Sequence, residues 1–229
     1  MAPCRIVVLI SGSGSNLQAL IDAQDTPALP DTQITLVLSN RKAAYGLQRA
    51  QNANPPIPTD YLALQPYLKA HPGATRTDYD AEVARIVLAA QPDLVILAGW
   101  MHVLGDTFLE PLSAAKAPRG WSPVPVINLH PAMPGQFDGA HAIERQYAAF
   151  QEGKIPHGGA MVHRVIRDVD RGTPLLVREV PMKKDEPIEA FERRLHEMEW
   201  KIIVEGAAKA LLEVHSLHSH TCLFAHDDS

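Results

Sequence analysis

Short apolar runs that alternate with helical patterns constrain the fold of this chain more than any other feature. Residues 6–10, 34–38, 94–98 and 126–130 are runs of mainly β-branched and aliphatic side chains, and helical patterns occupy residues 16–21, 44–52 and 78–90 between them. A strand that is apolar on both sides is buried on both faces, as in a parallel sheet covered by helices. The order of strands and helices therefore predicts an α/β fold, Rossmann-like in its N-terminal half, around a mostly parallel sheet.

The pattern changes in the C-terminal third of the chain. Residues 160–166 and 175–180 have the composition of strands and are separated by a turn, which predicts an antiparallel pair. Residues 188–212 carry the longest helical pattern, and residues 216–229 have no periodicity. Four prolines in residues 111–125 indicate an exposed loop. We expect one domain over residues 1–215, followed by a flexible tail over residues 216–229.

Charge and composition exclude several classes of protein. The chain has 21 Lys and Arg residues against 26 Asp and Glu residues, a net charge of −5, which is too acidic for a dedicated nucleic-acid-binding protein. Its apolar runs are far shorter than the ~18 residues of a membrane span. Two cysteines, Cys4 and Cys222, are too few for a disulfide framework, and the N-terminus has no signal-peptide pattern. We expect a cytoplasmic protein that binds neither nucleic acid nor membrane.

A glycine-rich loop follows the first strand and opens the first helix, with the sequence Ser11-Gly12-Ser13-Gly14-Ser15-Asn16. Backbone N–H groups at a helix N-terminus suit a phosphate, but a tight turn in which Ser15 or Asn16 caps the helix fits these residues equally well. A dinucleotide-binding loop carries a small residue where this chain has Leu17, and no acidic residue follows the second strand. Arg41 and Lys42 would suit the 2′-phosphate of NADP, but a monophosphate is the better fit.

Asn128 and His130 stand two residues apart at the end of a strand, so their side chains point to the same face. This is the edge of the sheet at which open α/β folds bind ligands. An amide beside an imidazole can stabilise an oxyanion and move a proton, but a strand end whose polar groups bond the next loop is equally consistent. Asp170 lies in a turn where an Asx turn is the default interpretation, and its spacing does not show whether it reaches His130.

Taken in order, five motifs resemble the phosphoribosylglycinamide formyltransferase family. They are ISGSGSNLQ (10–18), LAGWM (97–101), INLHP (127–131), VH (162–163) and DVDRG (168–172). Residues 134–139 and 142–145 are similar to the fungal, monofunctional form. The resemblance spans roughly residues 5–212. Asn-x-His-Pro alone marks the wider formyltransferase family, whereas its combination with the Ser-Gly-x-Gly-Ser-Asn loop is specific to this branch.

The resemblance implies transfer of a formyl group from 10-formyltetrahydrofolate to the amine of glycinamide ribonucleotide, in purine biosynthesis and without a metal. The matching positions imply catalytic roles for Asn128, His130 and Asp170. Asn128 and a protonated His130 would stabilise the tetrahedral oxyanion, and Asp170 would orient the imidazole and assist proton transfer. Family positions for ribonucleotide binding are Gly14, Ser15, Asn16, Arg76 (charge near the phosphate) and Glu199 (the amine). Those for the folate are Met101, His102, Val103, Leu104, Phe137, Gly139 and His141.

The chain departs from the family pattern near the folate positions. Residues 132–135 replace a usual Ser-Leu-Leu-Pro run, His102 replaces a basic residue, and residues 104–128 are longer than usual. None of these changes removes a catalytic side chain. The oligomeric state is left open between a monomer and a homodimer.

Two other classes of function remain open. A formyl-folate hydrolase, or a transferase to another amine, would share Asn128, His130 and Asp170 but would not need the glycine-rich loop. An NADP-dependent reductase or a non-catalytic nucleotide-binding module would use the loop but not those three side chains.

Overall fold

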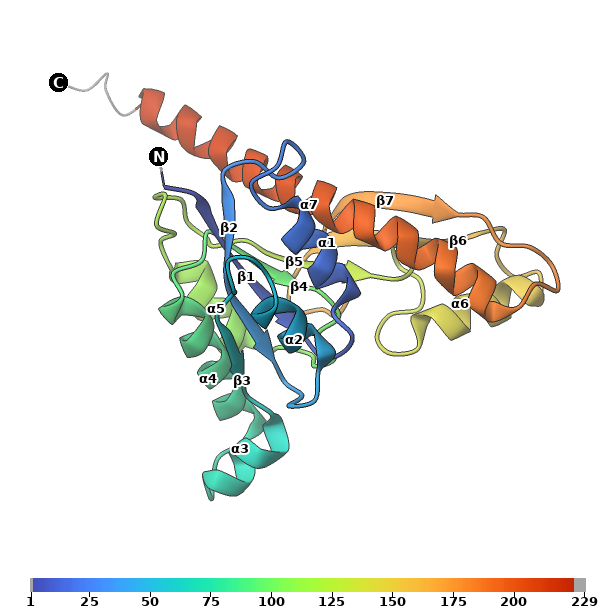
Figure 1. The fold of residues 1–229 in the computed structure, drawn as a ribbon, viewed down its shortest axis with the longest axis horizontal. Coiled ribbons are helices and arrows are strands. Elements are labelled where there is room, and N and C mark those ends of the chain that lie inside the picture. The colour runs from blue at the N-terminus through green and yellow to red at the C-terminus, as the bar shows by residue number, and fades with distance from the viewer. Residues whose placement is uncertain (1, 225–229) are drawn as a thin grey trace.

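A twisted sheet forms the centre of the protein (Figure 1). The computed structural model describes residues 2–224, with side chains as far as Ser216. Within this part of the chain the sheet has seven strands in the order β3-β2-β1-β4-β5-β6-β7. Strands β1 to β5 are parallel, and β6 and β7 are antiparallel to their neighbours. The predicted α/β fold with an antiparallel C-terminal pair is confirmed. The strands are β1 (Cys4–Ile10), β2 (Thr32–Ser39), β3 (Thr59–Tyr61), β4 (Leu94–Leu97), β5 (Val126–His130), β6 (Gly158–Arg164) and β7 (Pro174–Val180).

Helices cover both faces of the sheet. The first two helices and the long last helix lie together on one face, whereas α4 and α5 pack against each other on the other (Figure 1). Right-handed crossovers require this, because the connections β1–β2 and β3–β4 cross the sheet in opposite directions. The helices are α1 (Ser15–Ala23), α2 (Tyr45–Gln51), α3 (Leu64–Ala70), α4 (Arg76–Ala89), α5 (Asp106–Ala114), α6 (Ala142–Gln151) and α7 (Ile188–Phe224).

The reversal of strand order between β1 and β4 positions the functional site. The chain leaves β1 for one face and β4 for the other, which opens a crevice at the carboxyl ends of these strands. Strand β1 is rigid support for the crevice, because residues 6–10 have no exposed surface. The loops after β1, β4 and β5 all reach this edge.

Residues 111–125 are not the exposed loop that their prolines suggested. Helix α5 runs through Pro111 to Ala114, and the following segment places Trp121 and Val124 in the core. The Trp121 indole donates to the carbonyl of Asp93 at 3.1 Å. The prediction was wrong because it weighed the prolines and not the apolar residues between them, which pack against the sheet.

The last helix is longer than its sequence pattern indicated. Helix α7 continues past Ser216 to Phe224, so residues 216–224 are helical rather than a tail. Val214 is buried, and the His215 ring lies 4.8 Å from that of Trp121, centroid to centroid. These contacts carry the helix beyond residue 212. Residues 225–229 and the side chain of Cys222 lie outside the described part. Among the described residues, no helix combines the length and apolar character needed to cross a membrane.

Candidate active site

A cleft of about 820 Å³ opens at the carboxyl edge of the sheet. Its walls come from the loops after β1, β4 and β5, from the end of β6, and from α7. The cleft brings together most of the residues that the sequence singled out: Gly14, Ser15, Asn16, Met101, His102, Val103, Leu104, Asn128, His130, Gly139, His141, Asp170 and Glu199. Arg76 and Phe137 are not among its lining residues.

Arg76 and Phe137 instead support the walls of the cleft from outside. The Arg76 guanidinium donates to the carbonyl of Val103 and lies 3.6 Å from the Asp80 carboxylate, so it braces the loop after β4 and not the glycine-rich loop. The Phe137 ring faces the Arg145 guanidinium, 5.8 Å from it. The arginines that do line the cleft are Arg41 and Arg167.

The glycine-rich loop has the geometry of an anion site at a helix N-terminus. Gly14 is the residue before α1 and has a left-handed backbone, φ +71°. Helix α2 holds the loop from behind, because Gly46 N–H donates to the carbonyl of Gly12 at 3.1 Å and Arg49 donates to that of Ser13 at 2.8 Å. Leu17 is fully buried in the core, where a dinucleotide-binding loop needs a small residue. The loop geometry therefore favours a monophosphate over a dinucleotide.

Gly46 is a structural requirement of this loop that the sequence analysis missed. A Cβ at residue 46 would lie 2.4 Å from Ile10 Cδ1 and 3.1 Å from Gly14 Cα. We expect Gly46→Ala to lower the free energy of unfolding by about 1–3 kcal/mol, as overpacking does, measured by denaturant titration. Gly12→Ala is the matched control, because its Cβ would meet no atom within 4 Å. Equal stability of the two variants would contradict the close-packing argument.

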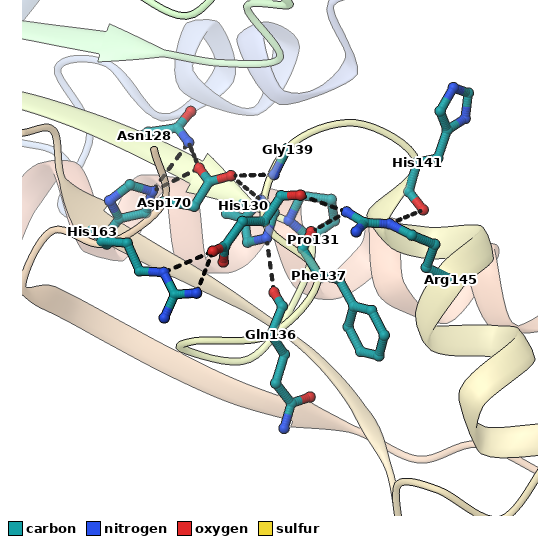
Figure 2. Close-up of polar contacts among 12 residues, drawn as sticks. Asn128, His130, Pro131, Gln136, Phe137, Gly139, His141, Arg145, His163 and Asp170 are labelled. Carbon is teal, nitrogen blue, oxygen red and sulfur yellow. Dashed lines mark hydrogen bonds and ion pairs between the residues drawn. The ribbon is translucent and has the colours of Figure 1, made fainter. Parts of the chain in front are cut away.

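Asn128, His130 and Asp170 form one hydrogen-bonded cluster (Figure 2). The Asn128 amide donates to Asp170 Oδ1 at 3.1 Å, and His130 Nδ1 lies 3.3 Å from Asp170 Oδ2. Gly139 N–H donates to the same Oδ2 at 2.8 Å. The spacing in the sequence did not show whether Asp170 reaches His130. In the structure, the 168–172 turn brings the Asp170 carboxylate to both Asn128 and His130. Contacts with the protein hold all three polar side chains in one arrangement.

His163 completes this cluster from the antiparallel strand. The register of β5 and β6 pairs Asn128 with His163, and the Asn128 amide lies 3.1 Å from His163 Nε2. His163 Nδ1 lies 2.9 Å from the carbonyl of Arg164, so this nitrogen carries a proton. His163 Nε2 also lies 3.4 Å from Asp170 Oδ1, so the ring contacts both the amide and the carboxylate. His163 belongs to the VH motif (162–163) of the sequence, and the pairing of β5 with β6 explains how it reaches Asn128.

Opposing influences set the protonation of His130 and Asp170. Burial lowers the pKa of His130, although the Asp170 carboxylate and the Gln136 carbonyl, 3.4 Å from Nε2, act in the opposite direction. Burial alone would raise the pKa of Asp170, but hydrogen bonds from His163 and Gly139 and the charge of His130 outweigh it, and the net pKa falls below its ordinary value. The resting site holds an ionised Asp170 beside an imidazole that gives up its proton readily.

Glu199 links the glycine-rich loop to α7. Its carboxyl is buried in the cleft wall, where Asn16 Nδ2 lies 3.4 Å from Oε2. Burial raises the pKa of Glu199 to about 7, while the hydrogen bond from Asn16 acts weakly against the shift. Asn16 Oδ1 is also buried and has no hydrogen-bond partner among the described residues. A carboxyl of this kind can take up or release a proton near neutral pH, which suits it to bind an amine.

The raised pKa of Glu199 makes stability depend on pH. Its unfolded form ionises near pH 4.5 and its folded form near 7, so stability falls as pH rises between these values. Replacement Glu199→Gln removes this effect. We expect the stability of the variant relative to wild type to increase by roughly 3 kcal/mol from pH 4.5 to pH 8, measured by chemical unfolding. Glu197→Gln, an exposed change on the same helix, should show no such trend; a trend in both variants would rule out this origin.

No group of three or more His, Cys, Asp and Glu side chains in the described part is arranged to hold a metal ion.

Comparison with known proteins places this cleft in a family. The formyl transferase family matches residues 4–206. Phosphoribosylglycinamide formyltransferase of Schizosaccharomyces pombe is 51% identical over 88% of this chain and 94% of its own length. The Saccharomyces cerevisiae protein of the same name is 45% identical over 92% and 99%. The crystal structure of phosphoribosylglycinamide formyltransferase from Bacillus halodurans, 25% identical, superposes with a TM-score of 0.75 over 90% of this chain and 95% of that one. The resemblance drawn from the motifs is confirmed, and the chain belongs to the formyl transferase family.

Proposed function

We propose that this protein transfers the formyl group of 10-formyltetrahydrofolate to the amine of glycinamide ribonucleotide, giving formylglycinamide ribonucleotide and tetrahydrofolate in purine biosynthesis. The observation that carries the proposal is that one cleft contains both the glycine-rich loop at the N-terminus of α1 and the cluster of Asn128, His130 and Asp170, with the Glu199 carboxyl beside the loop. Its relatives in Schizosaccharomyces pombe and Saccharomyces cerevisiae are named phosphoribosylglycinamide formyltransferase, which supports this acceptor and this group. Residues 1–215 form the catalytic domain, which acts in the cytoplasm as a monomer or a homodimer.

The ribonucleotide phosphate binds the N-terminus of α1, at Gly14, Ser15 and Asn16. There the backbone N–H groups and the helix dipole favour a doubly charged anion, and Arg41 adds a positive charge to the same cleft. Glu199 receives the amine end of the substrate. Because the pKa of this carboxyl is about 7, Glu199 can bind an ammonium group at neutral pH and take a proton from it before attack.

The folate binds along the loop after β4 and against residues 139–141. Met101 and Val103 expose 65% and 55% of their surfaces at the mouth of the cleft, and an apolar heterocycle would cover them. His102 lies deeper, between the rings of Trp100 and Tyr79. The formyl carbon is thereby directed toward Asn128 and His130.

The reaction forms a bond between the substrate nitrogen and the formyl carbon and breaks the bond from that carbon to the folate nitrogen. Attack places negative charge on the formyl oxygen, where the Asn128 amide and the protonated His130 imidazole donate hydrogen bonds. In the resting site the Asn128 N–H groups face Asp170 and His163, so the amide exchanges one partner for the oxyanion. Developing negative charge raises the affinity of His130 for a proton. Asp170 orients the ring, and one proton moves from the amine to the folate nitrogen.

Deformylation of 10-formyltetrahydrofolate, followed by absorbance with and without glycinamide ribonucleotide, tests this function. A change that requires the ribonucleotide is expected, with one equivalent of formylated product. A change without the ribonucleotide would indicate a formyl-folate hydrolase. Absence of any change in folded protein would reject formyl transfer, and a titration with NADPH would then test the nucleotide-binding alternative.

A further inference from the structure

Two loops meet over the imidazole of His130 in the cleft (Figure 2). The 135–141 loop follows β5, and the 168–172 turn connects β6 to β7. Each loop supplies one partner to the ring, because Gln136 O lies 3.4 Å from Nε2 and Asp170 Oδ2 lies 3.3 Å from Nδ1. Both partners are acceptors, so they favour the ring when both nitrogens carry protons. The relative position of the two loops therefore sets the orientation and the protonation of His130.

The backbone of these loops needs support from its surroundings. Phe137, His141 and Asp170 are non-glycine residues with left-handed backbones, φ 52°, 58° and 55°. Such conformations are disfavoured for side chains with a Cβ and persist where neighbouring contacts hold them. Arg145 provides part of this support by donating to the carbonyls of Phe137 and Asp138. A contact between the two loops has to provide the rest.

That contact is an ion pair one residue away from the catalytic carboxylate. Arg171 Nε and Nη2 both donate to Asp138 Oδ2, at 2.7 Å and 2.6 Å. In parallel, Gly139 N–H donates to Asp170 Oδ2 at 2.8 Å. Asp138 adjoins Gly139 and Arg171 adjoins Asp170, so the two contacts cross-link the loops at two successive positions. Loss of the ion pair would leave only the Gly139 bond of these two links between the loops.

We propose that Asp138 and Arg171 are positioning residues, which fix the 135–141 loop to the 168–172 turn and thereby hold Asp170 and Gln136 on opposite sides of the His130 ring. This role rests on the proposed formyl transfer for its effect on turnover. The pair itself does not line the cleft, and its side chains are partly exposed, 55% for Arg171 and 29% for Asp138. Its contribution is therefore one of geometry and charge around His130 and not of contact with substrate.

Several charged groups surround His130 and have to stay constant in a test of this pair. Asp170, Asp138 and His163 act on its pKa directly. The same cleft is lined by titratable or charged side chains from other elements: Arg41, His102, His141, Glu144, Arg167, His196 and Glu199. Substitutions confined to Asp138 and Arg171 leave all of these in place except the charge of Asp138 itself.

The test is a double-mutant cycle with Asp138→Asn, Arg171→Met and the two combined. Each single change should lower kcat about 10-fold, below the ~10²-fold cost of a fully misplaced catalytic group, with KM for the ribonucleotide within about twofold. The double variant should be no worse than the poorer single one, because neither partner acts without the other. Arg171→Lys should restore part of the loss. The pH profile of kcat should shift in both single variants and in the double variant, and it should shift less in Arg171→Lys.

The ion pair between Arg178 of β7 and Glu205 of α7, at 2.9 Å, is the matched control. It also joins two elements at the surface, and Arg178→Met should leave kcat and its pH profile unchanged. Additive losses in the cycle, an unshifted pH profile, or an equal loss in the control would overturn the proposal. NMR titration of the His130 ring keeps the test independent of turnover: Arg171→Met should lower the ring's pKa even if the protein proved not to transfer formyl groups, although removal of a positive charge by itself would raise that pKa. An unchanged ring pKa would overturn the positioning role, whereas inactivity of the wild-type protein would reject only the proposed function.

Discussion

Replacement of His130 by alanine is expected to lower kcat by about 10²-fold or more, because it removes a donor to the oxyanion from a water-poor site. His130 is almost fully buried, and its ring is already fixed between Asp170 and Gln136. The ring exchanges its long contact with Gln136 for the oxyanion and otherwise keeps its orientation when charge develops. Asn128→Ala is expected to have an effect of the same order. Initial rates of ribonucleotide-dependent deformylation at saturating substrate measure both.

The control for these variants is His71→Ala. His71 is an exposed histidine of the segment after α3, which bonds the carbonyl of Tyr67 and lies outside the cleft. The His71→Ala variant should turn over substrate at the wild-type rate. If the His130→Ala variant unfolds at the same temperature as the wild-type protein, its loss of activity comes from the missing imidazole and not from a loss of folded protein. Turnover near the wild-type rate in folded His130→Ala protein would remove the imidazole from the oxyanion site.

The central strands were predictable because each one carries its own signal. A run such as residues 6–10 is apolar on both faces, and only a covered sheet can bury it. Strand β3, with three residues at the sheet edge, is too short to show a pattern. Helix α5 was missed because Pro111 lies inside it, and a proline within a helical pattern usually marks its end. The prediction of the fold therefore failed at a very short strand and at a helix that contains a proline, and not in the overall topology.

Prediction of the site was limited by contacts between distant segments. Asn128 and His130 share a strand, so their alternation alone placed them together. Asp170 reaches them only because β6 returns antiparallel to β5, and no local pattern encodes that distance. Family resemblance identified Asp170 but misplaced Arg76, which the structure directs to Val103 and Asp80. Asp138 lies in the quoted segment 134–139 but was given no role there, since its role depends on a partner from another loop.

Replacement of Asp170 by asparagine is expected to lower kcat by about 10²–10³-fold, because it removes the charge that opposes the effect of burial on the His130 pKa. An asparagine oxygen can still accept from Gly139 N–H and tolerates the left-handed backbone at this position. The pKa of His130 should fall further in the variant, and less of the imidazole would be protonated as the oxyanion forms. The pH dependence of kcat and NMR titration of the ring measure this.

The pH dependence of stability distinguishes the effect of the Asp170 charge from the effect of the turn geometry at this residue. The folded-state pKa of Asp170 lies below its ordinary value, so its ionised form stabilises the protein above the unfolded pKa, and this contribution is lost as pH falls through the folded pKa. Asp170→Asn should thus be less stable than wild type at pH 7, and the difference should narrow as pH drops below ~4. Asp185→Asn is the control, because Asp185 is an exposed aspartate with the same left-handed backbone, φ 57°. A difference in stability that stays constant with pH would assign the role of Asp170 to its turn geometry, and would leave His130 to gain its proton without help from that charge.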